Sequence, residues 1–162
     1  MKKLVLLIAA ALLLSGCAAE ETYETISDEL LVPAMAQPRE ITVNLPGEAA
    51  LPAMESDNGR AYLCQDYEIY VQTLEGGDMN ATVQTLSGYE KDSLTVMETE
   101  QEGLKRYEFV WASAGEMGER IGRAVVLDDG SYHYTLTILR DEATTETSQI
   151  SWDDIFSSFA VS

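Results

Sequence analysis

Apolar residues alternate with polar ones over most of the chain from Glu40 onward, and this two-residue period predicts β-strands. Tyr67, Ile69 and Val71 illustrate the pattern, because their side chains share one face of an extended chain. Turn-forming dipeptides such as Asn58-Gly59 separate the alternating segments. The alternation predicts an antiparallel sheet of about six to eight strands, which lie around residues 41–43, 49–53, 62–64, 67–74, 94–96, 106–111, 121–127 and 132–138.

The clearest predicted hairpin joins the last two of these strands. If Asp129-Gly130 forms the two-residue turn, Leu127 lies opposite Tyr132. This register places the large apolar residues of both strands on one face, which supports it. It also pairs Val125 with Tyr134, Ile121 with Ile138, Arg123 with Leu136 and His133 with Val126.

A helical period replaces the alternation at two places. Residues 78–87 begin with Asp78, a good N-cap, and are followed by Gly88, which suits a left-handed C-cap. The last helix begins after the capping residue Ser151. Its apolar face comprises Trp152, Ile155, Phe156 and Phe159. We therefore expect an α+β fold, in which a short mid-chain helix and a C-terminal amphipathic helix accompany the sheet.

The N-terminus combines positive charge with a short apolar run. Lys2 and Lys3 precede an unbroken apolar stretch from Leu4 to Leu14. A membrane-spanning helix needs roughly 20 residues, so this shorter run is typical of a secretory signal. It ends in Leu14-Ser15-Gly16-Cys17, which resembles the lipobox of bacterial lipoproteins. The resemblance implies a diacylglyceryl group on Cys17 and a lipid anchor at the extracytoplasmic face of the cell membrane. An ordinary signal peptide with a chance cysteine is the alternative.

The chain is thereby predicted to have three regions. Residues 1–16 are the lipoprotein signal peptide, residues 17–38 the lipidated cysteine with an acidic tether, and residues 39–162 a single α+β domain. The tether holds five acidic residues and no basic one, so self-repulsion favours a flexible chain. A segment that folds on contact with a partner is the alternative interpretation.

The order of elements over residues 40–160 resembles that of Mog1/PsbP-like domains, which stack an antiparallel sheet between helices. Those domains often end in an aromatic-rich helix with a Ser-Phe pair, here Ser158-Phe159. The chain is also similar to small uncharacterised lipoproteins of gut Firmicutes. The Mog1/PsbP-like resemblance implies a non-catalytic binding or assembly role.

Charge restricts the class of partner. The chain carries 28 acidic and 10 basic residues, a formal charge of -18. Cleavage before Cys17 removes Lys2 and Lys3 and leaves 8 basic against 28 acidic residues, a charge of -20. Nucleic acid is excluded as a partner, because phosphate binding needs clustered Lys and Arg.

Candidate catalytic residues are few. His133 is the single imidazole, so a Ser-His-Asp triad would have to use it with Ser131 or Ser113. A structural histidine is the simpler interpretation. Cys64 is the one thiol besides Cys17, and in a strand it is typical of a small buried side chain, a reactive thiol being the alternative. We expect no metal or cofactor, since no segment has the ligand spacing of a calcium loop. Paired carboxylates for hydrolysis remain open.

Half of the basic residues of the processed chain gather on two predicted strands, namely Lys105, Arg106, Arg120 and Arg123. They are candidates for one docking patch that receives an anionic group. Cross-strand pairing with acidic residues such as Glu108 is the alternative.

We therefore expect a membrane-anchored binding or accessory module without catalytic activity, whose partner is a protein or another envelope component. A secreted hydrolase with paired carboxylates and a purely structural envelope protein are the alternatives. A hydrolase should have a cleft with two facing carboxylates.

Overall fold

The computed structural model describes residues 37–162, apart from 116–117 and 142–151. These residues belong to one compact unit. The lipobox with Cys17, nearly all of the predicted tether and the predicted cap at Ser151 lie outside the described residues. Within the described part, no helix is long and apolar enough to cross a membrane.

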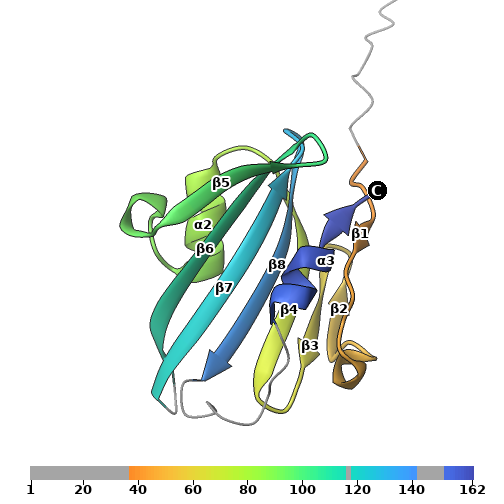
Figure 1. Ribbon diagram of the computed structural model, residues 1–162, viewed down its shortest axis with the longest axis vertical. Coiled ribbons are helices and arrows are strands. Elements are labelled where there is room, and N and C mark those ends of the chain that lie inside the picture. Colours follow the sequence, from red (N-terminus) through yellow and green to blue (C-terminus); the bar gives the residue numbers. More distant parts are fainter. Residues whose placement is uncertain (1–36, 116–117, 142–151) are drawn as a thin grey trace, which may run out of the picture. The chain divides into compact units, whose positions relative to one another are not determined.

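Seven antiparallel strands form the main sheet, in the order β2-β3-β4-β8-β7-β6-β5 (Figure 1). A small second sheet pairs β1 (Ile41–Thr42) with β9 (Ala160–Val161). The main sheet comprises β2 (Met54–Ser56), β3 (Gly59–Leu63), β4 (Tyr67–Glu75), β5 (Val96–Gln101), β6 (Leu104–Gly115), β7 (Gly118–Asp128) and β8 (Tyr132–Asp141).

Among the described residues, two α-helices and two 3-10 turns accompany the strands. The helix α2 (Met79–Ser87) follows β4, and α3 (Trp152–Ser158) precedes β9. The 3-10 turns are η1 (Gly47–Ala49) and η2 (Lys91–Ser93). The predicted α+β class, with an antiparallel sheet, a mid-chain helix and a C-terminal helix, is confirmed. The closer resemblance to Mog1/PsbP-like domains stays a prediction.

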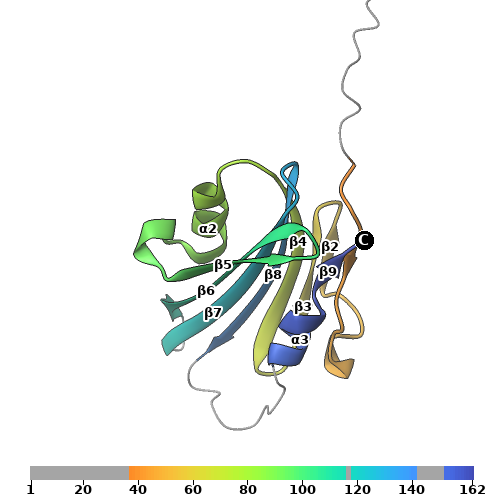
Figure 2. The same cartoon turned by 45° about the horizontal axis from the view of Figure 1, so that its top comes forward.

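The two helices pack on opposite faces of the main sheet (Figures 1 and 2). One core contains Ile155 and Phe156 of α3, and we call that side the α3 face. The other core contains Val83 of α2 and defines the α2 face. Strand β7 contributes residues to both cores, because alternate side chains of a strand point to opposite faces of the sheet. Its residues Val125 and Leu127 lie on the α3 face, and Ala124 and Val126 on the α2 face.

The caps of α2 are those that the sequence predicts. The carboxylate of Asp78 accepts a hydrogen bond of 3.0 Å from the backbone N–H of Asn80. Gly88 ends the helix with φ 80°, a left-handed conformation that glycine adopts at little cost. Its N–H donates to the carbonyl of Gln84 at 2.8 Å. The start and the end of the helix are therefore defined by contacts between residues that are close in sequence.

The predicted register of the β7–β8 hairpin is wrong by two residues. Leu127 pairs with Tyr134, not Tyr132, because the two residues of the turn are Gly130-Ser131 rather than Asp129-Gly130. The Asp129 carboxylate explains the shift, since it accepts hydrogen bonds from the backbone N–H groups of Ser131 and Tyr132. A shift of two preserves the face of every side chain. Val125 pairs with Leu136, Arg123 with Ile138 and His133 with Asp128.

The predictions for the N-terminal part need a second correction. No strand forms at residues 49–53: η1 occupies Gly47–Ala49, and β2 begins at Met54. Strand β1 pairs with β9, which the sequence does not predict. Backbone hydrogen bonds between Glu40 and Ser162 of 3.3 Å and 3.0 Å join the two ends of the described chain. Strand β1 therefore pairs with a strand at the other end of the described chain and not with a strand next to it in sequence.

Candidate functional site

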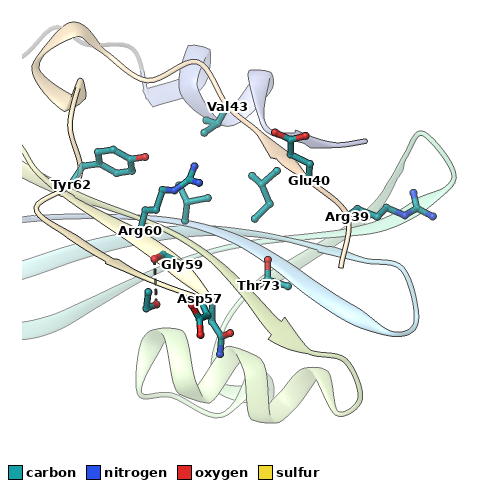
Figure 3. A pocket seen from close by; sticks show the side chains of 12 residues that line it. Arg39, Glu40, Val43, Asp57, Gly59, Arg60, Tyr62 and Thr73 are labelled. Atoms are coloured by element: carbon teal, nitrogen blue, oxygen red, sulfur yellow. Dashed lines mark hydrogen bonds between the residues drawn. The ribbon is translucent and has the colours of Figure 1, made fainter. Parts of the chain in front are cut away.

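A cavity of about 220 Å³ lies on the α3 face, between β1 and the β2–β3 hairpin (Figure 3). Tyr62 of β3 lines it together with Val71 and Thr73 of β4. Ile41 and Val43 line it from the β1 segment. We call this space the hairpin cavity. It combines aliphatic side chains with hydroxyl and charged groups, as small-ligand sites do.

Long-range contacts position the β1 side of the hairpin cavity. Besides the β1–β9 ladder, the backbone N–H of Asn44 donates to Ser158 Oγ of α3 at 2.9 Å. The hairpin side is held equally closely. A Cβ atom on Gly59 would lie only 2.6 Å from the carbonyl oxygen of Val71, so β3 approaches β4 too tightly there for a larger residue. Both sides of the cavity are thus fixed by the fold.

Arg60 is the cationic group of the hairpin cavity. It pairs with Val71 of β4 and with Glu55 of β2, which places it on the α3 face. Its Nε donates to Glu55 Oε1 at 2.9 Å. That hydrogen bond, the charge of Glu55 and the neighbouring Tyr62 raise the pKa of the guanidinium. Figure 3 shows the Arg60 side chain beside Tyr62 and facing Val43.

Two carboxylates also line the hairpin cavity, but they do not form a facing pair. Asp57 lies in the β2–β3 turn and Glu40 precedes β1. Figure 3 shows the Glu40 carboxylate directed away from Asp57. The guanidinium of Arg39 also points away from the cavity, and its Nε lies 3.6 Å from Asp129 Oδ2. Arg60 and Asp57 are therefore the charged groups closest to a ligand here.

The four cations of the predicted docking patch do not lie together. Arg106 and Arg123 are on the α3 face, where Nη2 of Arg106 lies 3.4 Å and Nε of Arg123 2.9 Å from the carboxylate of Glu108. Lys105 and Arg120 lie an even number of residues from the α2-face core residues of their own strands. They therefore point to the α2 face. The prediction of a single patch is thus wrong, because consecutive strand residues diverge. The alternative, cross-strand pairing with Glu108, describes Arg123, whereas Arg106 contacts Glu108 along the same strand, β6.

Arg123 connects the sheet to α3. Its Nη1 lies 2.6 Å from Asp153 Oδ1, and its guanidinium carbon lies 4.4 Å from the ring centroid of Phe156. Arg106 bonds Gln101 at 2.7 Å, and Gln101 in turn donates to the carbonyl of Phe159 at 2.9 Å. These contacts hold α3 and the start of β9 against the sheet. Arg120, on the other face, contacts Glu68 at 2.7 Å.

His133 occupies a structural position. Its side chain is 1% exposed, and its Nδ1 lies 2.7 Å from Thr82 Oγ1 of α2. Its Nε2 lies 3.7 Å from Asp128 Oδ1. The neighbouring hydroxyl is therefore that of Thr82, not of Ser131 or Ser113. Thr82 is also buried, so a substrate could not reach this hydroxyl without opening the core.

Cys64 is half-buried rather than buried, and it packs against the core of the α3 face. Burial raises the pKa of its thiol, and the nearby Glu48 charge acts in the same direction, whereas the bond with Tyr67 opposes them. The thiol form is thus favoured, which suits the structural interpretation. Among the described residues, no group of three or more His, Cys, Asp or Glu is arranged to hold a metal ion.

The hairpin cavity could not be found from sequence periodicity. Its residues come from the β1 segment, the β2–β3 turn and the middle of β4, and the β1–β9 ladder that brings them together has two residue pairs. The sequence feature closest to the hairpin cavity is the Asn58-Gly59 dipeptide, which marks the turn at the rim of the cavity.

No family model and no curated protein matches the chain. A crystal structure from Bacteroides thetaiotaomicron is similar to it, with a TM-score of 0.50 and 8% sequence identity. The similarity covers 75% of this chain and 45% of the other, so this chain spans less than half the length of that protein. At this identity the likeness shows the fold alone.

Proposed function

We propose that this protein is a membrane-anchored binding module, held at the extracytoplasmic face by a lipid on Cys17, whose ligand occupies the hairpin cavity. The observation that carries the proposal is the position of Arg60 in a cavity that is lined in part by aliphatic side chains. A cation held in place beside apolar surface provides both orientation and affinity for a ligand. The partner is a protein or another component of the envelope.

The diverging Glu40 and Asp57 carboxylates favour binding over hydrolysis at this cavity. Glycoside hydrolysis needs two carboxyl groups about 5–10 Å apart on either side of the scissile bond. The Glu40 carboxylate instead points away from Asp57 and out of the cavity. Arg60 and Tyr62 lie where a ligand would bind, and neither supplies a carboxylate for such a pair.

A photo-crosslinking residue placed at Asn58, on the rim of the hairpin cavity, tests the proposal in intact cells. Thr99 is the matched control, since it is also exposed but belongs to β5 at the far edge of the sheet. We expect a discrete adduct from the Asn58 position and none from Thr99. Equal adducts from both positions would contradict a ligand site in the cavity.

The lipid anchor is tested separately by labelling cells with a palmitate analogue. We expect Cys17→Ala to abolish labelling and to release the protein from the membrane fraction, because no acyl chain would then hold it. Cys64→Ala is the matched control and should retain both properties. Retention of label by the Cys17 variant would overturn the anchor.

A further inference from the structure

The hairpin cavity presents one guanidinium to a ligand. Of the six arginines among the described residues, Arg39 and Arg60 are exposed and the other four are at most partly exposed. Arg39 points out of the cavity toward Asp129, whereas the Arg60 side chain, 58% exposed, lies within it. Arg60 is therefore the cation that determines which chemical group of a ligand can bind in the cavity.

The Arg60 guanidinium is oriented before any ligand binds. Glu55 holds it through Nε, which does not engage the two terminal Nη groups. A planar guanidinium offers paired N–H donors that match the two oxygens of a carboxylate. An exposed pair of this kind is weak, so Glu55 orients the Arg60 side chain without competing strongly with a ligand.

The charges around Arg60 favour a monoanion over a dianion. Glu55 contacts the same guanidinium and Asp57 lines the same cavity, within a chain of charge -18. A phosphate monoester carries about -1.5 to -2 charges at pH 7 and would meet this acidic surface with stronger repulsion than a carboxylate. A carboxylate is therefore the anion that one arginine can hold here.

The other residues that line the cavity indicate what the part of the ligand beyond the anion should be. Ile41, Val43 and Val71 offer branched aliphatic surface, and the volume of about 220 Å³ limits the ligand to a small group. Resting on the proposed function, we infer that the hairpin cavity binds the carboxylate of a small acid with an aliphatic part, with Arg60 as the anion-binding residue. A free short-chain acid and the C-terminal residue of a peptide both carry this chemistry.

Binding of defined probes to the full-length chain in detergent, measured by ligand-observed NMR, tests the inference. The probes are isovalerate, N-acetyl-alanyl-leucine with a free carboxylate, the same dipeptide as its C-terminal amide, and inorganic phosphate. We expect the free acid to bind at least tenfold more tightly than the amide and than phosphate. The ratio of dipeptide to isovalerate affinity then assigns the ligand to a peptide end or to a free acid.

Three variants distinguish a specific role of Arg60 from the effect of the chain's overall charge. Arg60→Gln should weaken the acid by at least tenfold, and Arg60→Lys should weaken it less, because the charge stays while the paired donors are lost. Arg39→Gln removes an equal charge from a guanidinium that points away from the cavity, and it should change affinity by less than twofold. Unchanged thermal unfolding of each variant shows that the fold is intact.

The outcomes separate this inference from the proposed function. Equal binding of acid and amide, or unchanged binding by Arg60→Gln, would overturn the carboxylate assignment and leave the cavity as a binding site. Failure of every probe to bind would also overturn the carboxylate assignment. The crosslinking experiment at Asn58 tests the proposed function independently. Equal loss in the Arg39 and Arg60 variants would show a long-range charge effect and refute a specific role for Arg60.

Discussion

His133 is the single histidine of the chain, and its ring lies in the core between β8 and α2. Burial lowers its pKa below the ordinary 6.5, and the charges of Asp128 and Asp129 oppose that shift only in part. The unfolded chain therefore takes up a proton below about pH 6.5, whereas the folded chain does so at lower pH. Because His133 contacts Thr82, protonation of the ring would affect the packing of α2 on the sheet.

We predict that the free energy of unfolding falls as the pH drops from about 6.5 toward 5, with a slope of up to about 1.4 kcal/mol per pH unit. Folded and unfolded His133 are both neutral above this window, so stability is highest there. The variant His133→Gln should lose this slope, as measured by urea unfolding at several pH values. A slope in the variant equal to that of the wild type would show that other groups carry it.

Gly88 shows how one backbone angle defines an element. Its φ of 80° ends α2, and an alanine there would be strained although nothing crowds its Cβ position. We predict that Gly88→Ala lowers the free energy of unfolding by about 1 kcal/mol, measured by urea unfolding. Gly47→Ala is the matched control, since its Cβ position is equally open and its φ is not left-handed. Equal losses in both variants would contradict a conformational origin.

The elements that the sequence predicts are those whose periodicity and turn residues lie within the segment itself. Helix α2 and the strands β4, β6, β7 and β8 carry their own periodicity, and the structure has them near the predicted bounds, whereas β5 spans Val96–Gln101 and not residues 94–96. The β7–β8 register was missed because the carboxylate of Asp129 captures two backbone N–H groups and moves the turn by one residue. The two-residue strands β1 and β9 have no period to detect, and their pairing depends on contacts more than 110 residues apart.

The candidate site depends on the non-local elements and was therefore missed. Arg60 belongs to β3, which the sequence predicts only from residue 62 onward, and its role depends on Ile41 and Val43 reaching it from β1. The four clustered cations in sequence were a misleading signal, because neighbouring strand residues point to opposite faces. Sequence proximity of like charges predicts a patch on a helix or loop better than on a strand.

The acidity of the whole molecule acts on every element at once. A formal charge of -18 makes the folded chain repel itself, while few cations are free to offset it, since Arg106, Arg120 and Arg123 already contact acidic partners. Salt screens the long-range repulsion more than these short, partly buried contacts, because the Debye length falls from about 30 Å at 0.01 M to about 8 Å at 0.15 M.

We therefore predict that adding sodium chloride between 0.01 and 0.15 M raises the free energy of unfolding, on the order of 1 kcal/mol. Urea is the denaturant of choice, because guanidinium chloride would itself screen the charges. Exposed pairs such as Arg60 with Glu55 weaken under the same conditions, but each contributes about 0–1 kcal/mol at most. Potassium chloride at equal ionic strength should act equally, since screening depends on ionic strength alone. An effect of sodium alone would show specific ion binding, and a fall in stability would show that local ion pairs outweigh the repulsion of the whole molecule.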